Sequence, residues 1–368
     1  MSAASGSDQR SDDRPGMALR TARQAGRRGA IAFGLGLLTD LAPPGAWSPR
    51  PLEGPLLELR SATAAAIAER WSGTEAVGWE GTIDGARFVV ERGHAGDHRF
   101  VHGAPPAEDG TPTAATRAVH HLCADARVLS CAPSDPDDPS WWRELLDSTL
   151  FTAALLRGYE ALHAGAVATP YGAIAITAAS GGGKSTLLSE LLIRGSTLLA
   201  DDVLVLESRG VAQAPRAHPA PPLMTVPSAR VALLREALAP GTPTIATFAQ
   251  EQWLAVPVHP EPLPLAGVVV LNRAPGLAPA LHREAQPLTA LLAGLLRFPR
   301  TRARERTRFE MAGAIAAHAP VWRLDADPGV SPATLSELLL AELSAIDATS
   351  SEPAVRAVLP ARQPIVTR

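Results

Sequence analysis

Lysine is almost absent from this sequence. The chain of 368 residues carries 34 lysines and arginines, and Lys184 is the only lysine among them. Such a bias is typical of GC-rich coding, which replaces lysine wherever arginine will serve. The one lysine that is kept therefore indicates a position where a compact ammonium group is needed and a planar guanidinium is unsuitable.

Cysteine and long apolar runs are scarce as well. Cys123 and Cys131 are the only cysteines, and no zinc-site pattern accompanies them, which predicts two buried thiols in a reducing compartment. No stretch reaches the roughly 18 apolar residues of a membrane span. A formal net charge of −3 argues against a general nucleic-acid binder. We therefore expect neither a membrane nor a nucleic acid as a partner.

The N-terminal region bears on the location of the protein. Residues 1–28 are polar and rich in arginine, and we predict that they are disordered. Arg27-Arg28 before the apolar run Gly29–Leu38 is similar to a twin-arginine export signal, but the run is short and Asp40 follows it. We expect a cytoplasmic protein, with export as the alternative.

Length and patterning predict two domains. The first is a small α+β domain with an antiparallel sheet, and its clearest element is a hairpin of Val77–Ile83 and Ala86–Glu91 around Asp84-Gly85. In the second, an α/β domain, strands and helices alternate. The predicted segments are a disordered or loosely ordered tail at 1–50, the α+β domain at 51–135, a connecting helix at 136–160, the α/β domain at 161–348 and a loose tail at 349–368.

The predicted connecting helix carries two adjacent tryptophans. Trp141 and Trp142 lie among leucines at helical spacing, so one face of the helix is expected to be buried. Core or inter-domain packing is the expected role of the tryptophans, and stacking on an adenine ring is the alternative.

The second domain contains a glycine-rich loop between a strand, Ala173–Ala178, and a helix, Lys184–Arg194. The pattern agrees with G-x-x-x-x-G-K-[ST] except that Ala178 replaces the first glycine, which costs strain only if that residue needs a positive φ. Such a loop cradles the phosphates of a nucleoside triphosphate, so we expect ATP and Mg²⁺ as cofactors. The predicted binding residues are Ser180, Gly181, Gly182, Gly183, Lys184, Ser185 and Thr186.

Each part of the loop has its own expected task. Backbone N–H groups from Ser180 to Lys184 would hold the phosphates, helped by the positive end of the helix. Lys184 would span the β- and γ-phosphates, and the hydroxyl of Ser185 would bind Mg²⁺. A glycine-rich loop without a ligand is the alternative.

Two acidic residues follow the next apolar strand. Asp201-Asp202 comes directly after Thr197–Ala200, where the second element of a phosphate-loop protein holds Mg²⁺. One carboxylate can bind the metal while the other accepts the proton of an attacking hydroxyl. The alternative is that one acid only caps a turn or faces solvent. His163, at the start of the strand Leu162–Ala168, is a further candidate, although a lone histidine is more often structural.

Together these residues resemble the C-terminal catalytic domain of HPr kinase/phosphorylase and its HPr-kinase-like relatives. That family has a histidine-led strand, a G-x-S-G-x-G-K-[ST] loop, a helix that ends in Arg-Gly and a strand that ends in Ala-Asp-Asp. The corresponding features here are His163, Ala178–Ser185, Arg194-Gly195 and Ala200–Asp202. The close match spans residues 162–206, and the rest of the domain agrees only in the order of its elements.

The resemblance implies a fold and a set of roles. The second domain would be a P-loop kinase-like domain of the HPr kinase C-terminal type. Asp201 would be the general base in phosphorylation of a serine hydroxyl, Asp202 and Ser185 would bind Mg²⁺, and His163 would lie near the transferred phosphate. Members of the family often assemble, which leaves a homo-oligomer open.

Departures from the family bear on the substrate. The glycine-rich segment that serves phosphorylase activity is not found, and the N-terminal region differs, so we expect neither that activity nor HPr as the acceptor. Similar stand-alone relatives occur with machinery that modifies ribosomally made peptides, including lasso peptides, where they phosphorylate a precursor serine. The expected function is an ATP- and Mg²⁺-dependent kinase acting on a serine of a peptide or protein. The alternatives are a small-molecule hydroxyl kinase and a nucleotide-binding regulatory ATPase without phosphotransfer.

A cluster of arginines stands apart from these motifs. It would either clamp a phosphate or acidic substrate or form a solvated basic face, and the second is the more frequent arrangement. The cluster comprises Arg297, Arg300, Arg302, Arg304, Arg306 and Arg308.

Overall fold

The structure is a computed structural model that describes residues 28–45, 47, 54–83, 86–103, 115–210, 212–238, 242–248 and 250–349. The chain divides into two compact units, Met1–Arg157 and Gly158–Arg368, called unit 1 and unit 2 below. Both contain helices and sheets, in agreement with the coarse prediction of a mixed α/β protein. The helical segment that we expected to connect two domains falls almost wholly within unit 1.

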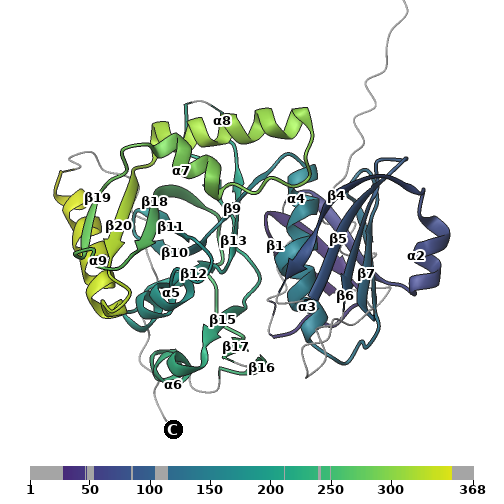
Figure 1. The fold of residues 1–368 in the computed structure, drawn as a ribbon, viewed down its shortest axis with the longest axis horizontal. Coiled ribbons are helices and arrows are strands. Elements are labelled where there is room, and N and C mark those ends of the chain that lie inside the picture. Colours follow the sequence, from purple (N-terminus) through teal and green to yellow (C-terminus); the bar gives the residue numbers. More distant parts are fainter. Residues whose placement is uncertain are drawn as a thin grey trace, which may run out of the picture. The chain divides into compact units, whose positions relative to one another are not determined.

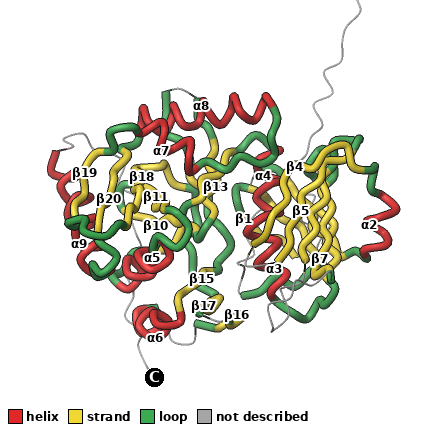
Figure 2. The backbone as a smooth tube through the Cα atoms, viewed as in Figure 1, coloured by secondary structure: helices red, strands yellow, loops and turns green. Residues whose placement is uncertain are grey.

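Unit 1 is built on an eight-stranded sheet in the order β1-β2-β3-β8-β7-β6-β5-β4 (Figures 1 and 2). Along β6 and β7 buried residues alternate with more exposed ones, as expected for a sheet with one face on the core. One short helix, α2 (Ala64–Arg70), begins at an N-cap in which the Thr63 hydroxyl accepts the Ala66 N–H. The strands are β1 Arg28–Ala32, β2 Leu35–Thr39, β3 Leu56–Ser61, β4 Thr74–Ile83, β5 Ala86–Gly93, β6 His98–Gly103, β7 Thr116–Leu122 and β8 Val128–Pro133.

Strands β1 and β2 correct the prediction of a loosely ordered tail at 1–50. They form a hairpin whose turn residues, Phe33 and Gly34, both have a positive φ, 56° and 74°, as a two-residue hairpin turn requires. Leu35 and Leu37 are completely buried. The prediction was wrong here because β2 is stabilised by parallel pairing with β3, a partner that no local pattern reveals. Residues 1–27 lie outside the described residues.

The sheet is also mixed rather than antiparallel as predicted, since both β2–β3 and β3–β8 are parallel pairs. The predicted hairpin is confirmed, because β4 and β5 pair antiparallel as far as Ile83 and Ala86. Its Asp84-Gly85 turn lies outside the described residues, as does the predicted C-terminal tail beyond Thr349. Of the two cysteines, both free, Cys131 is buried as predicted, whereas Cys123 is only partly buried.

The tryptophan-rich helix has a π-helical middle. It runs through α3 (Ser140–Glu144), η1 (Leu145–Leu150) and α4 (Phe151–Leu156). Trp141 and Trp142 are 3% and 4% exposed, and their rings stack with centroids 4.6 Å apart. The core-packing prediction is therefore confirmed, and neither ring is available to stack on a nucleotide base.

Unit 2 is organised around a sheet with the path β12-β10-β11-β18-β14-β13-β9, while β20 pairs with β18 and β19 with β20. The eleven-residue strand β18 lies between β11 and β20, both parallel to it, as expected for its apolar sequence. The strands are β9 Glu160–His163, β10 Gly165–Thr169, β11 Gly172–Ala178, β12 Thr197–Ala200, β13 Val203–Glu207, β14 Arg216–Ala217, β18 Leu263–Arg273, β19 Ala280–Arg283 and β20 Val321–Ala326.

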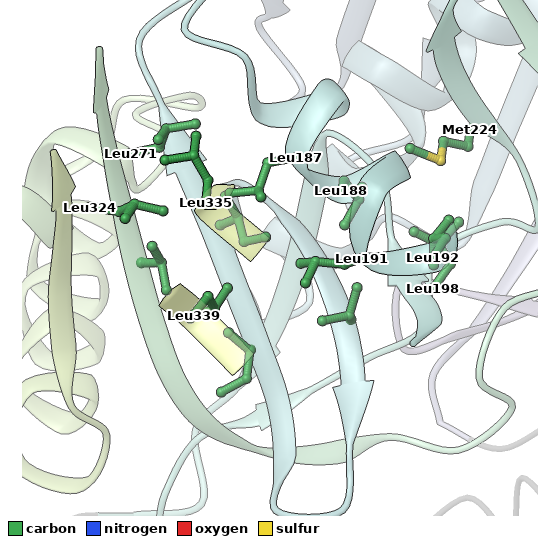
Figure 3. Packing of buried hydrophobic residues seen from close by; sticks show 14 of the residues in the cluster. Leu187, Leu188, Leu191, Leu192, Leu198, Met224, Leu271, Leu324, Leu335 and Leu339 are labelled. Atoms are coloured by element: carbon green, nitrogen blue, oxygen red, sulfur yellow. The ribbon is translucent and has the colours of Figure 1, made fainter. Parts of the chain in front are cut away.

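Helices lie on both sides of this sheet, with α5 on one side and α7 and α8 on the other (Figure 1). Leucines of α5 and α9, including Leu187, Leu191, Leu335 and Leu339, pack with β18 and β20 and are almost completely buried (Figure 3). Each such side chain contributes about 1.5–3 kcal/mol. The helices are α5 Lys184–Ile193, α6 Ser228–Ala237, α7 Pro287–Gly294, α8 Arg302–His318 and α9 Pro332–Thr349.

A second, three-stranded sheet in unit 2 did not follow from the sequence. It has the order β15-β17-β16, with β15 Met224–Pro227, β16 Thr244–Thr247 and β17 Glu251–Leu254. Strands of four residues with proline and polar residues show no clear alternation. Met224, Val226 and Leu254 are completely buried in the same core as α5, which holds this sheet within unit 2.

No helix in the described part of the chain combines the length and the apolar character that crossing a bilayer requires.

Candidate functional site

The carboxyl ends of three strands meet at one edge of the unit 2 sheet. β11 and β12 both pair antiparallel with β10, which lies between them, so they run in the same direction. β18 is parallel to β11 on its other side. The segments that follow β12, β11 and β18 therefore emerge side by side, where open α/β sheets bind ligands. They carry the two predicted aspartates, the glycine-rich loop and Arg273.

The loop after β11 has the backbone of an anion-binding turn. Gly181 and Gly183 have φ of 71° and 89°, and the Gly182 N–H donates to the Ala179 carbonyl at 2.9 Å. A Cβ on Gly182 would lie 2.8 Å from that same oxygen, so the tight turn requires glycine. Ala178 is the last residue of β11 and is not among the residues with positive φ. Alanine therefore replaces the first glycine of the pattern without strain.

Helix α5 begins at Lys184, directly after the loop. The first N–H groups of a helix have no partner within it and carry a partial positive charge, so they attract an anion. Ser185 and Thr186 lie in this first turn and are partly exposed. The loop residues Ala179, Ser180 and Gly181 are exposed, so the loop can be reached from solvent.

Three of the predicted site residues are brought together at Asp202. Its Oδ1 atom accepts a close hydrogen bond from the Lys184 ammonium and lies 3.1 Å from Nε2 of His163. Burial raises the pKa of Asp202, but the hydrogen bond from His163 and the charge of Lys184 outweigh it and hold the pKa well below its ordinary value. The carboxylate is therefore charged at neutral pH, while 45% of its side chain stays exposed.

The meeting of His163 with Asp202 follows from strand register. Residues 160–169 and 197–207 form an antiparallel ribbon, in which Ala166 pairs with Ala200 on one side and His163 with Val203 on the other. Between these pairs the ribbon is interrupted, and Asp202 has a φ of 63°, a region that aspartate enters more readily than most residues. The interruption turns Asp202 out of the ladder beside His163.

Asp201 occupies a different environment. Its Oδ2 atom accepts the backbone N–H of Thr225 in β15 at 2.8 Å, so this carboxylate ties the end of β12 to the small sheet. The two adjacent aspartates, which we expected to act as a pair, therefore contact different residues.

Three polar residues near the same edge were missed by the sequence analysis. Asn272 and Arg273 end β18, and the Asn272 amide donates to Oδ1 of Asp325 in β20 at 2.6 Å. Their signal was available, because polar residues directly follow the apolar run of a central strand.

The arginine cluster is not a uniform solvated face. Arg304 makes a bidentate ion pair with the fully buried Glu160 in β9. Arg308, 7% exposed, donates to the Leu292 carbonyl at 2.7 Å. Arg306 is exposed and pairs with Glu310 on the same helix. Two members are thus structural, and only part of the cluster meets solvent.

Comparison with known proteins finds similarity among solved structures. No protein-family model matches the chain, and no curated protein matches it. Among solved structures it is similar to the HPr(Ser) kinase/phosphatase from Coxiella burnetii, at 16% sequence identity and a TM-score of 0.29, over 51% of this chain and 98% of that one. These values indicate a distant structural relationship and carry no assignment of activity.

Proposed function

We propose that the protein is an ATP- and Mg²⁺-dependent kinase that transfers the γ-phosphate to a hydroxyl group. The first candidate acceptor is a serine of a peptide or protein, including a ribosomally made precursor peptide. The observation that supports this most directly is the contact of Asp202 with both Lys184 and His163, beside a loop with the backbone of an anion-binding turn.

The loop and Lys184 serve to bind the triphosphate. Backbone N–H groups at the start of α5 donate to phosphate oxygens. Lys184 is 8% exposed and its charge is balanced by Asp202. Phosphate oxygens offer the ammonium a more highly charged partner, so binding draws Lys184 away from Asp202 and leaves the carboxylate facing the γ-phosphate.

Transfer needs an acceptor for one proton. The acceptor oxygen forms a bond to the γ-phosphorus, the bond from that phosphorus to its bridging oxygen breaks, and ADP leaves. The hydroxyl proton passes to a carboxylate. Contacts favour Asp202 for this role over Asp201, because Asp202 lies beside Lys184 and His163 whereas Asp201 is engaged by the Thr225 N–H. His163 is placed to orient Asp202.

The residues present fit a magnesium ion held partly by the nucleotide. Among the described residues no group of three or more histidine, cysteine or acidic side chains forms a metal site. Mg²⁺ characteristically uses only one or two carboxylates together with phosphate oxygens and water. Ser185 and one aspartate of the pair would hold it, and the ion would neutralise charge on the phosphates.

The test is transfer of labelled γ-phosphate to serine-containing peptides and to small hydroxyl compounds. Asp202→Asn is expected to keep ATP affinity within about threefold and to lower transfer by about 10²- to 10⁴-fold. Lys184→Met is expected to weaken ATP binding by at least about tenfold. Asp201→Asn is the matched variant, since it makes the same substitution one residue away.

The outcomes separate the alternatives. A larger loss in Asp201→Asn than in Asp202→Asn would return the role of base to Asp201, as the family resemblance implies. ATP hydrolysis with no transfer to any hydroxyl would instead support a regulatory ATPase. Normal transfer in both aspartate variants would overturn the kinase mechanism.

A further inference from the structure

The two sides of the glycine-rich loop differ in charge. On the β12 side stand the carboxylates of Asp201 and Asp202 together with His163. On the other side β18 ends in Asn272 and Arg273, one strand beyond β11. If phosphate transfer takes place beside Asp202, the end of the nucleotide that is not transferred must lie toward β18.

Arg273 lies against the loop on this second side. A Cβ atom built on Gly183 would be 3.9 Å from Nη1 of Arg273, so the guanidinium is adjacent to the residue that precedes Lys184. Because Gly183 has no side chain and a φ of 89°, nothing from this residue stands between the guanidinium and the N-terminus of α5.

The hydrogen bonds of Arg273 use only part of its guanidinium. Nη2 donates to the carbonyl oxygens of Pro328 and Val330, whereas Nε is buried and has no partner in the described chain. Within the described residues no carboxylate forms an ion pair with Arg273. Asp327 is a charged neighbour whose pKa is lowered by the backbone N–H groups of Gly329 and Gly276, with a smaller effect from Arg273. Nη1 is therefore free to bind a ligand.

The position of this cation is unfavourable without an anion. Arg273, at the end of β18, lies beside the residue that precedes Lys184 and the positive end of α5, and like charges near a helix N-terminus destabilise one another. Lys184 forms an ion pair with Asp202, whereas Arg273 forms none with any carboxylate of the described residues and has only the weaker electrostatic influence of Asp327. A bound phosphate would remove this imbalance, because guanidinium groups bind phosphate oxygens through charge-assisted hydrogen bonds.

We infer that Arg273 binds the non-transferred end of the nucleotide, at the α- and β-phosphates, and so sets the direction in which the triphosphate lies across the loop. This inference rests on the proposed function, because it takes Asp202 as the side of transfer. Arg273 is a binding residue in this arrangement, and it takes no part in the proton transfer.

The experiment compares Arg273→Gln with wild-type protein, using ATP, ADP and inorganic pyrophosphate as probes in calorimetric titrations. Arg273→Gln is expected to weaken ATP and ADP by a similar factor of about tenfold, the usual loss for a hydrogen bond to a charged group. At saturating ATP the transfer rate is expected to stay within about twofold. Arg273→Lys is expected to recover part of the affinity.

The matched control is Arg194→Gln, which removes the same charge from the opposite end of α5, where Arg194 pairs with Glu190 and Glu337. It is expected to leave nucleotide affinity unchanged. Thermal unfolding without nucleotide measures how far loss of the Pro328 and Val330 contacts affects folding. Affinity is measured only on variants that are folded at the assay temperature. If Arg273→Gln is unfolded there, the affinity of Arg273→Lys is used in its place.

The outcomes distinguish this inference from the proposed function. Unchanged ATP and ADP affinity in Arg273→Gln would overturn the inference and leave the kinase proposal standing. Weakened binding of ATP alone, with ADP unaffected, would place Arg273 at the γ-phosphate and reverse the direction. A tenfold loss for both nucleotides in a protein that phosphorylates no hydroxyl would support the binding role and contradict the kinase. Absence of any nucleotide binding by the wild-type protein would overturn both.

Discussion

Unit 1 and unit 2 bury ionisable side chains in different ways. In unit 1, His102 and His120 lie between the sheet and the tryptophan-rich helix, and neither ring nitrogen of His120 has a hydrogen-bond partner in the described chain. Burial lowers the pKa of His120 to about 3, so the ring is neutral. In unit 2, Glu160 is completely buried but faces the guanidinium of Arg304. At His120 unit 1 buries a neutral ring without a partner, whereas at Glu160 unit 2 buries a carboxylate together with a partner of opposite charge.

This difference teaches where chemistry can take place. The neutral His120 ring, which lies against the rings of His102 and Trp141, contributes packing and little else. At the β12 edge of unit 2, by contrast, Asp202 and Lys184 hold opposite charges in a place that ligands can reach. In such an ion pair, a ligand of higher negative charge can replace Asp202 as the partner of Lys184.

Breaking the buried pair of unit 2 is expected to have the largest effect on stability. Arg304→Met leaves the Glu160 carboxylate buried without its partner, and loss of one member of such a pair typically costs about 3–5 kcal/mol. Chemical denaturation monitored by hydrogen exchange in β9 and β18 measures the change. The double variant Glu160→Leu with Arg304→Leu is the control and is expected to recover most of the stability. A loss below about 1 kcal/mol in the single variant would contradict the pairing.

Acidification is expected to weaken unit 1 before it affects the Asp202 ion pair. The pKa of His98 is lowered to about 4 and that of His120 to about 3, mainly by burial. Above about pH 6.5, the ordinary pKa of histidine, these rings are neutral in both the folded and the unfolded chain, and stability is at its full value. As the pH falls below about 6.5, the unfolded chain binds protons that the folded unit does not, so the free energy of unfolding decreases. The loss is at most about 3 kcal/mol for each histidine by pH 4.

Two neighbours also respond to acid. His102 faces His120, and its lowered pKa adds to the loss. The pKa of Glu144 is raised by burial despite the nearby Arg117, and protonation of this carboxyl offsets part of the loss. Hydrogen exchange in β6 and β7 between pH 7 and pH 4 is the measurement. Equal protection at both pH values would show that the histidines of unit 1 are not held neutral.

Removing the unpartnered ring from unit 1 is expected to have a smaller and opposite effect. His120→Phe replaces two unsatisfied nitrogens with apolar atoms of similar shape, which should raise the free energy of unfolding by about 1 kcal/mol. The matched control is His121→Phe, because His121 lies 2.9 Å from the Asp97 carboxylate and its loss should destabilise the unit. Destabilisation in both variants would indicate that His120 has a partner.

Arg306, an exposed arginine of α8, is expected to contribute least to stability. Arg306→Gln breaks only the surface pair with Glu310, which water and salt screen. The midpoint of thermal unfolding should not change measurably, in contrast to Arg304→Met two residues away. A clear shift in the midpoint would mean that the arginine cluster acts as one unit.

The sequence predicted the elements that are determined by residues close together in the chain. The strand, loop and helix around Lys184 follow from an apolar run, glycines and a leucine-rich helix, and β18 follows from its apolar length. The hairpin β1–β2 was missed because its stability depends on pairing with β3, and β15–β17 because their strands are too short to show alternation. The mixed sheet of unit 1 was likewise set by parallel partners far apart in the chain.

For the candidate site, the sequence by itself determined which groups are available: a solitary lysine, a glycine-rich loop, two adjacent acids and a histidine. Tertiary structure decided which of them meet. Register between β9 and β13 brings His163 to Asp202, Thr225 of a separate sheet takes up Asp201, and the strand order brings Arg273 to the loop. The physical reason is that pairing between side chains distant in the chain depends on strand register and order, which no single segment encodes.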